Sequence, residues 1–410
     1  MSDFNLPKIE NSVYSPFEKV AFYSIFLNNF SLLVTIKDGV AWESDSFLGY
    51  GHFLEHVNFQ KTDKYKSFMA LASFAESMGA KLSAFTSRDS VTYGIYAPSW
   101  SLKEAFEIMT SILSHLEFND EVIDEEKKIV FREMDRDKLN FRDFAVMQTE
   151  SELLSPNPIS RYSLGTQKSL SSINSKSLSD YKSEVYCREN ISIVLCGGFD
   201  ASQAEELTAT MLESLPGGKE RKLREFSQKT PEEKIKKFDF SAPSNQVRMI
   251  KYFSLPKPCQ RFWLPASILN TLLGVGFSCL FYEKLRHENK LVYTLATQMK
   301  LYSETSLFRF VADINPEHIS LADNLINDVL FGVISEENLT IAKNKYWGDI
   351  ALKLSDMKAF SEFVARRFFL DNELIHLGEI YETLKSINPD MINDFVRNNF
   401  DKNKSILGVC

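Results

Sequence analysis

The amino-acid sequence predicts an α+β fold built from two homologous domains that are related by internal duplication. The first observation is a weak repeat at an offset of 214 residues, in which Leu170-Ser-Ser-Ile-Asn174 returns as Leu384-Lys-Ser-Ile-Asn388. The second is that Asn190-Ile-Ser-Ile-Val194 returns, after one deletion, as Asn403-Lys-Ser-Ile-Leu407. In both copies a helical stretch leads into a β-branched segment, so each half should end in the order helix, turn, strand.

The expected domain boundaries follow from a change in composition between the two copies. Residues 216–240 are rich in charge and lack an apolar pattern, and we interpret them as a solvated linker. The N-terminal domain would then span residues 1–215 and the C-terminal domain residues 241–410. A chain of 410 residues is long enough for two such domains, each with its own core.

Near the N-terminus, the most apolar stretch of the chain runs from Val20 to Val40. It is interrupted by polar residues such as Asn28, Asn29 and Lys37, so it is too polar for a membrane span. We interpret it as two strands joined by a turn.

The five residues His52-Phe-Leu-Glu-His56 carry the most information about chemistry. Two imidazoles four residues apart on a helix lie on one face, and neutral imidazole nitrogen is a favoured ligand of Zn²⁺. Glu55 points to nearly the same side, where it could take a proton from an attacking water. The order H-x-x-E-H inverts H-E-x-x-H and is the inverzincin signature. The alternative is a helix whose two histidines make ordinary polar contacts.

A third ligand should lie on a separate helix, for which Asp120–Asn140 is the best candidate segment. Glu126 and Glu133 are seven residues apart there and so share one helical face. The side of this helix expected to be buried carries Ile129, Val130 and Met134. A carboxylate on an apolar face needs a partner, and a zinc ion is one. The alternative is that both glutamates face solvent on a charge-rich helix.

Residues 49–65 resemble the signature of the pitrilysin/insulinase family of zinc metallopeptidases, and more closely its short-chain branch of mitochondrial and bacterial processing peptidases. In that family the third zinc ligand lies 77 residues beyond the second histidine, and a supporting glutamate precedes it by seven; these positions are Glu133 and Glu126 here. The resemblance implies one Zn²⁺ per chain, held by His52, His56 and Glu133, with Glu55 as the general base. It also implies that each domain is an antiparallel-rich sheet with helices packed on one face.

Other segments extend this resemblance along most of the chain. Gly79–Tyr93 resembles the family's active-site edge strand, and the resemblance implies that a peptide substrate lies extended near Ser83–Thr86. Leu285–Tyr293 resembles the segment of an arginine–tyrosine pair that assists substrate binding and carbonyl polarisation. The corresponding residues are Arg286 and Tyr293. The second half has no H-x-x-E-H motif; residues 264–276 there read as an apolar helix ending in glycines.

The sequence departs from the family pattern at three positions. Ser83 stands where asparagine is usual, which puts a substrate contact or the geometry of the edge strand in doubt. Gly51 replaces the usual alanine before the first histidine, a mild penalty for a helix. Lys290 replaces a usual glycine and weakens the assignment of the arginine–tyrosine pair. None of these positions belongs to the metal set.

Composition restricts the class of protein. Hydrophobic content of 44% and charged content of 25% are those of an ordinary globular protein, and a net charge of −8 argues against a nucleic-acid binder. The N-terminus lacks the features of a signal peptide, and no stretch suits a membrane span. The five cysteines form no C-x-x-C pair and fit buried free thiols in a reducing compartment. We therefore expect a cytoplasmic protein.

The function expected from this reading is a zinc-dependent endopeptidase that cleaves peptides or precursor leader segments inside a chamber. In the family such a chamber is enclosed by four homologous domains, and this chain supplies two, so the resemblance implies a second chain. Arg286 and Tyr293 on the same chain favour a homodimer. One alternative is the catalytic subunit of a heterodimer with a related chain. Another is a non-catalytic partner or assembly subunit, since the family includes members whose metal set has degenerated; the set is intact here.

Overall fold

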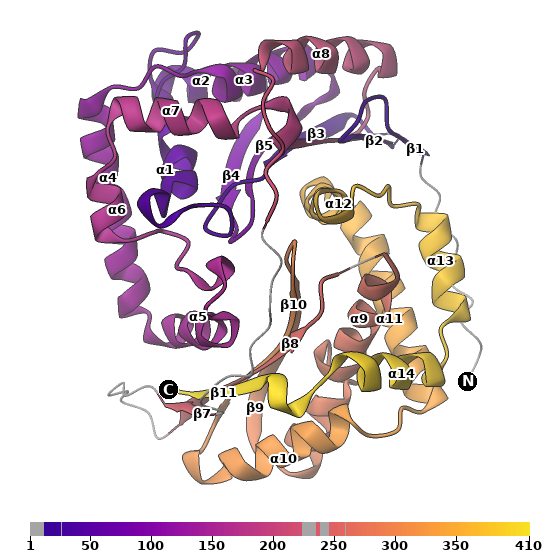
Figure 1. Cartoon of the computed structure of the whole chain (residues 1–410). Helices are drawn as coiled ribbons and strands as arrows, with labels where there is room; N and C mark the ends of the chain where they lie inside the picture. The colour runs from indigo at the N-terminus through magenta and orange to yellow at the C-terminus, as the bar shows by residue number, and fades with distance from the viewer. Residues whose placement is uncertain (1–11, 26, 224–234, 238–245, 259) are drawn as a thin grey trace.

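The computed structural model of the chain describes residues 12–25, 27–223, 235–237, 246–258 and 260–410 (Figure 1). It contains two β-sheets, one in each half of the chain, and helices pack against both. The predicted α+β fold class is confirmed.

The N-terminal sheet has the strand order β1-β2-β6-β3-β5-β4. Its strands are β1 (Ser12–Tyr14), β2 (Val20–Ser24), β3 (Asn29–Ile36), β4 (Lys81–Thr86), β5 (Val91–Pro98) and β6 (Ile191–Gly197). The helices of this half are α1 (Tyr50–Val57), α2 (Phe68–Ser77), α3 (Leu102–Ser114), α4 (Asp120–Leu139), α5 (Phe141–Leu154), α6 (Gln167–Ser171), α7 (Ser175–Val185) and α8 (Ala201–Ser214). The strands β2 and β6 are parallel, and the other neighbours are antiparallel.

The C-terminal sheet has the strand order β7-β11-β8-β10-β9. Its strands are β7 (Ile235–Lys237), β8 (Val247–Leu255), β9 (Val292–Leu301), β10 (Ser306–Ile314) and β11 (Ser405–Val409). The helices of this half are α9 (Gln260–Gly274), a π-helix (Tyr282–Glu288), α10 (Ile319–Leu330), α11 (Glu336–Leu354), α12 (Met357–Asp371), α13 (Leu377–Ser386) and α14 (Pro389–Asn399).

The two sheets repeat one topology. Strands β2, β6, β3, β5 and β4 occupy the places that β7, β11, β8, β10 and β9 occupy in the second sheet. In both sets the first two strands are parallel and the remaining neighbours are antiparallel. The expected helix, turn, strand endings are α7 with β6 and α14 with β11. The weak repeat in the sequence therefore marks a repeat in three dimensions.

Residues 216–240 differ in part from the solvated linker that composition predicts, since residues 216–220 and Lys222 are exposed but other described parts are bound to the fold. Ile235–Lys237 form β7 and pair in parallel with β11, so they belong to the C-terminal sheet. Arg221 is largely buried, and its guanidinium donates to the carbonyl oxygens of Lys37 and Trp42. The charged composition hid this strand because an edge strand is held by backbone hydrogen bonds and tolerates lysine.

Each half also sends one helix to the sheet of the other half. Helix α5 packs on strands β8 and β11, whereas α12 packs on β3 and β6 (Figure 1). Tyr23 and Leu33 of the N-terminal sheet belong to the same apolar cluster as Phe360 and Val364 of α12. Both faces of β3 are therefore buried, which explains the nearly continuous apolar run in its sequence. In each half, the helices of that half cover one face of the sheet, and the helix from the other half lies on the opposite face.

A buried carboxylate joins the two halves beneath this exchange. Glu150 of α5 forms an ion pair with Arg88 at 3.1 Å and another with Lys300 of β9. The hydroxyls of Tyr252 and Tyr302 donate to it at 2.8 and 2.6 Å. Burial acts to raise the pKa of Glu150, but the charges of Arg88 and Lys300 outweigh it and lower the pKa to about 2. Glu150 therefore stays ionised and links α5 to the C-terminal sheet.

A second buried carboxylate makes a similar link from the turn between β4 and β5. Asp89 pairs with Arg366 of α12 at 2.9 Å and accepts hydrogen bonds from the backbone N–H and hydroxyl of Ser303 at 2.7 and 2.8 Å. Burial opposes ionisation, but the charge of Arg366 dominates and lowers the pKa of Asp89. The hairpin that carries the edge strand β4 is thus fixed to the second half.

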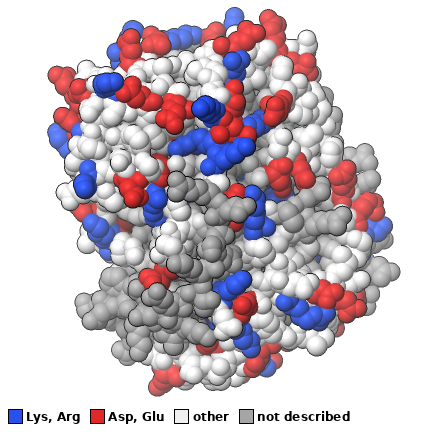
Figure 2. Space-filling model, viewed as in Figure 1, with Lys and Arg blue, Asp and Glu red and all other residues white. Residues whose placement is uncertain are grey.

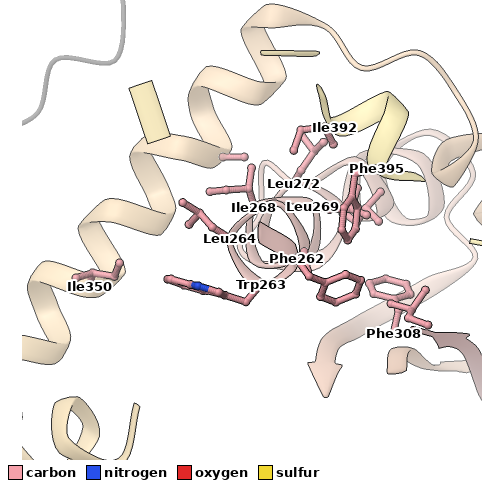
Figure 3. Packing of buried hydrophobic residues seen from close by; sticks show 14 of the residues in the cluster. Phe262, Trp263, Leu264, Ile268, Leu269, Leu272, Phe308, Ile350, Ile392 and Phe395 are labelled. Atoms are coloured by element: carbon pink, nitrogen blue, oxygen red, sulfur yellow. The ribbon is translucent and has the colours of Figure 1, made fainter. Parts of the chain in front are cut away.

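The C-terminal core is built around α9, which packs against the edge strand β9 and against α11. Phe308, Ile350, Ile392 and Phe395 surround it from other elements, as Figure 3 shows. The apolar residues of α9 labelled there are Phe262, Trp263, Leu264, Ile268, Leu269 and Leu272. The apolar helix expected over residues 264–276 is therefore a core helix.

Acidic and basic side chains are interspersed over the face of the molecule shown in Figure 2. Among the helices that the structure describes, none has the length and apolar character needed to cross a bilayer. The described cysteines are free and buried, as expected, and they are Cys187, Cys196, Cys279 and Cys410. Cys259 lies outside the described residues.

Candidate metal centre

Helix α1 separates its apolar residues from its chemically active ones. Phe53, Leu54 and Val57 are buried in the core of the N-terminal half. His52 and His56 lie one turn apart on the other side, and their ring centroids are 4.8 Å apart. The i, i+4 spacing of the motif therefore places both imidazoles side by side.

Helix α4 packs against α1 and brings Glu133 to both imidazoles. Glu133 Oε2 lies 3.7 Å from His52 Nε2 and 3.5 Å from His56 Nε2. One potential ligand atom from each of the three side chains lies within 4.8 Å of the other two. Among the described residues, these three form the one group of histidine, cysteine and carboxylate side chains close enough to hold a metal ion.

The protonation chemistry of the two histidines differs. Burial, helped by the neighbouring His56, lowers the pKa of His52 to about 3, so His52 is neutral and offers the lone pair that a zinc ligand needs. Burial also acts to lower the pKa of His56, but its hydrogen bond with Glu126 and the charges of Glu133 and Glu55 raise it. Two imidazoles and one carboxylate fit the donor set of a catalytic zinc site, which keeps a fourth position open.

Glu126 lies behind His56 rather than beside the potential ligand atoms. Its Oε2 is 3.2 Å from His56 Nδ1, and its Oε1 accepts a hydrogen bond from Gln60 Nε2 at 2.7 Å. Its side chain is buried, so it is not one of two solvent-facing glutamates. His52 differs, because its Nδ1 is buried without a hydrogen-bond partner among the described residues.

The prediction of which residues of α4 are buried is partly wrong. Val130 and Met134 are buried, but Ile129 is 39% exposed. Ile129 lies one position off the stripe formed by Glu126, Val130 and Met134, because 3.6 residues per turn rotate it away from α1. The buried stripe of α4 therefore includes a carboxylate where a helix of an ordinary core has an apolar side chain.

Glu55 lies between the two histidines and makes a contact that the sequence did not suggest. Thr86 Oγ1, from the last residue of β4, donates a hydrogen bond to Glu55 Oε2. Burial raises the pKa of Glu55, and the hydrogen bond from Thr86 acts in the opposite direction. The alternation of side chains along β4 places Thr86 on the same face as Leu82 and Ala84. This alternation is the one feature of the sequence that could have predicted the orientation of Thr86.

The strand β4 is the edge of its sheet and has β5 as its one neighbour in the strand order. A sheet edge offers unpaired backbone groups to an extended peptide. Ser83 packs over Gly94 of β5, where an added Cβ would lie 2.8 Å from Ser83 Oγ. A pocket of about 710 Å³ lies between α2 and this strand, and its lining includes Phe59, Phe68 and Leu82.

The structure explains the glycine that precedes the first histidine. A Cβ on Gly51 would lie 2.9 Å from Asp38 Cγ, so the backbone of α1 approaches a buried carboxyl group too closely for alanine. The expected helix penalty of glycine is therefore accompanied by a packing requirement.

Arg286 and Tyr293 lie together in the C-terminal half, whereas His52 and His56 belong to the N-terminal half. The Arg286 guanidinium is 4.7 Å from the centroid of the Tyr293 ring, and its Nη1 donates to the carbonyl oxygen of Val292 at 3.1 Å. The Tyr293 side chain is 72% exposed at the start of β9. Lys290 has a φ of 55°, a left-handed conformation that favours the glycine usual at this position.

The comparisons with known proteins identify the family of the chain. Residues 27–167 match the model of the family described as insulinase (peptidase family M16), and residues 172–346 match the model described as the peptidase M16 inactive domain. The "Uncharacterized zinc protease YmxG" of Bacillus subtilis is 22% identical over 383 residues, which cover 91% of each chain. Subunit beta of the mitochondrial-processing peptidase of Mus musculus is 29% identical over 203 residues, covering 50% of this chain and 41% of that protein.

Solved structures show the same fold over the whole chain. The crystal structure of a protease from Helicobacter pylori aligns with a TM-score of 0.83 at 18% identity, and the alignment covers 98% of this chain and 99% of that one. At this identity the likeness concerns the fold, and the two-sheet architecture is what the two proteins share.

Proposed function

The chain belongs to the insulinase (peptidase M16) family, and from this premise we propose that it is a zinc-dependent endopeptidase. The observation that carries the proposal is the convergence of His52 Nε2, His56 Nε2 and Glu133 Oε2, with Glu55 on the same short helix as the two histidines. In this proposal the first three residues hold one zinc ion per chain and Glu55 is the general base. Its substrates are peptides or the leader segments of precursors.

The reaction is hydrolysis of a peptide bond. A zinc ion held by this donor set supplies a Lewis acid that polarises the scissile carbonyl and lowers the pKa of water towards 7. Glu55 accepts a proton at Oε1, the oxygen that Thr86 does not bind, from the attacking water. The water oxygen forms a bond to the carbonyl carbon, the C–N bond breaks, and Glu55 returns the proton to the leaving amine. The burial that raises the pKa of Glu55 makes it a stronger base than an exposed glutamate.

Several side chains orient this set without taking part in proton transfer. Glu126 accepts from the ring of His56 and so supports the orientation in which Nε2 faces Glu133. Gln60 holds the second oxygen of Glu126. A substrate would lie extended beside β4 near Ser83–Thr86 and pair with its backbone.

We also propose that the working unit contains two chains. Arg286 and Tyr293 lie on the half that has no H-x-x-E-H motif, which supports a role opposite the zinc site of a neighbouring subunit. Both residues are present on this chain, which favours a homodimer over a heterodimer with a related subunit. The intact donor set favours a catalytic chain over a non-catalytic assembly subunit, and the buried free thiols support a cytoplasmic location.

The direct test measures zinc and peptide cleavage in the purified full-length chain. Elemental analysis should give about one zinc per chain for the wild type and a large loss in His52→Ala and Glu133→Gln. Stoichiometric zinc in both variants would overturn the ligand assignment. If the wild-type chain forms a defined dimer and binds zinc but does not cleave an unstructured peptide library, the result would favour a role as a non-catalytic assembly subunit.

The two-chain proposal has its own test. Mixing Glu55→Gln chains with Tyr293→Phe chains, each nearly inactive alone, should restore part of the activity through mixed dimers with one intact site. Subunit exchange is followed separately with fluorescently labelled chains. Exchange without any rescue would show that the site is completed within one chain or by another protein.

A further inference from the structure

Beneath the first turn of α1 lies a group of buried charged side chains that the proposed mechanism does not use. Asp38 and Glu43 belong to the loop that follows β3, and both are buried. Tyr181 of α7 donates to Asp38 Oδ1. Arg221, from the segment after α8 that leads to the second half, places its guanidinium 3.3 Å from the same oxygen. The Arg221 guanidinium thus pairs with Asp38, and its charge also acts on Glu43, near the start of the helix that carries His52 and His56.

Glu43 holds the N-terminus of α1. Its Oε2 accepts the backbone N–H of Gly49 at 2.7 Å, and its Oε1 accepts that of Gly51 at 2.8 Å. The first N–H groups of a helix lack partners inside the helix, and the residue at the N-cap usually supplies one. Gly49 is the N-cap here and has no side chain to do so. The carboxyl group of Glu43 therefore replaces the cap.

Arg221 in turn holds the loop that presents Glu43. Its Nη1 donates to the carbonyl oxygen of Lys37 at 3.0 Å, and its Nη2 donates to that of Trp42 at 2.9 Å. Lys37 directly follows β3, and Trp42 directly precedes Glu43, so the two carbonyls bracket the first part of the loop. The backbone N–H of Arg221 donates to Asn190 Oδ1 at 2.8 Å, which fixes the segment itself. One guanidinium from far along the chain therefore braces the whole loop.

The charges of this group support the same arrangement. Burial and the neighbouring Asp38 raise the pKa of Glu43 to about 8, while the hydrogen bonds from Gly51 and Gly49 and the charge of Arg221 act in the opposite direction. A buried carboxyl group that loses its cationic partner is strongly destabilised, which applies to the pair of Asp38 and Arg221. The charge of Arg221 acts towards ionisation of Glu43, but burial and Asp38 outweigh it, so the two hydrogen bonds from α1, and not a full charge on Glu43, hold the start of the helix.

We propose that Glu43 and Arg221 are positioning residues of the metal centre, through which the segment joining the two halves sets the position of α1. The inference rests on the proposed zinc site. Glu43 fixes the helix within one residue of His52, and Arg221 fixes Glu43. The affinity for zinc should therefore depend on a segment that contributes no ligand.

The test compares Glu43→Ala, Glu43→Gln and Arg221→Met with Lys222→Met, an exposed neighbour that loses the same charge. Zinc affinity is measured by competition with a chromophoric chelator, and the visible spectrum of the Co²⁺-substituted protein reports the geometry of the ligands. Melting of the metal-free proteins measures stability separately. Loss of a group that orients metal ligands weakens metal binding by about 10- to 100-fold.

We expect Glu43→Ala and Arg221→Met to weaken zinc binding by at least about 10-fold and to change the cobalt spectrum. Glu43→Gln should be intermediate, since its amide oxygen still accepts one N–H, and Lys222→Met should match the wild type. Zinc affinity within about twofold of the wild type, with an unchanged spectrum, would overturn the inference even if the melting temperature fell. If Glu43→Ala does not fold, Glu43→Gln and Arg221→Lys decide by the same criterion. A wild-type chain that binds no zinc would contradict the proposed function instead.

Discussion

The two halves of the molecule place equivalent helices beside equivalent edge strands, yet they fill the contact between those helices differently. In the N-terminal half, α1 packs on β4 and α4, and the facing side chains are two histidines and two glutamates. In the C-terminal half, α9 packs on β9 and α11, and the facing side chains are apolar, among them Trp263, Leu264 and Ile350 (Figure 3).

The difference shows how a duplicated fold separates chemistry from stability. Helix α1 has eight residues and leaves one side to polar groups, whereas α9 has fifteen and buries apolar residues against several elements. Buried polar groups cost stability unless they are paired, so a metal site is destabilising until its ligands find partners. The second copy fills the equivalent contact with apolar side chains and carries no such cost.

The largest expected effect is the loss of turnover in Glu55→Gln. Removing a general base from a preorganised site lowers the rate by about 100- to 10,000-fold, while zinc content and melting temperature should stay near those of the wild type. Steady-state peptide cleavage measures the effect. Glu125→Gln, on the exposed side of α4, is the matched control and should cleave normally. Wild-type turnover in Glu55→Gln would contradict the chemical role proposed for the contact between α1 and α4.

The converse change is Leu269→Ala in the core of α9. Leu269 is fully buried, so the cavity should cost about 3 kcal/mol of unfolding free energy, while zinc content stays at about one per chain. Chemical denaturation followed by circular dichroism measures it, with the exposed Leu352→Ala as the control. Loss of zinc from a folded Leu269→Ala protein would show that the two helix pairs are not independent.

An effect of similar size is expected where the halves meet, at Glu150. Its pKa is lowered to about 2 from an ordinary value of 4.5, which corresponds to about 3 kcal/mol of stability at neutral pH. Because the folded-state pKa is the lower one, this stability is present above pH 4.5 and is lost as the pH falls towards 2. Denaturation of wild type and Glu150→Gln between pH 7 and pH 2 tests this. The two curves should converge at low pH, and a constant difference would exclude titration of Glu150 as the cause.

The smallest effect concerns Thr86, which connects the edge strand to Glu55. Thr86→Val keeps the shape but removes the hydroxyl, so kcat should fall by about 10-fold, the equivalent of one lost hydrogen bond to a charged group. KM should change little, and Thr86→Ser should restore most of the rate. A rise in KM without a change in kcat would assign Thr86 to peptide binding on β4 instead.

The sequence was sufficient for relations that local geometry or a long repeat encodes. The spacing of His52 and His56 predicted their shared face, because an α-helix fixes the direction of residues four apart. The repeat at residues 170–194 and 384–407 predicted the duplication, and the two sheets have the same strand order. The resemblance in residues 49–65 pointed to Glu126 and Glu133, which the helix period alone left open between solvent and metal.

Tertiary structure decided the contacts between residues that are distant in the chain. Whether Glu126 faced α1 or solvent depended on how α4 packs, and the same packing exposed Ile129. The packing of α5 and α12 on the sheet of the other half follows from the topology of the fold, which the hydrophobic periodicity of the sequence does not reveal. Gln60 beside Glu126 has a local signal, its i+4 spacing from His56, but its role required the position of α4.

The supports of the site show the same division. The sequence by itself determined which residues could bind a metal, since ligand chemistry and helical spacing are local properties. Only the folded chain brings Thr86 to Glu55, Glu43 to the start of α1 and Arg221 to the loop before it. These contacts span 31, 6 and 179 residues of sequence, and the longest of them starts from Arg221, within the segment that composition predicts to be a linker. Each of these hydrogen bonds joins different elements of the fold. It depends on how those elements pack, which the two bonded residues alone do not determine.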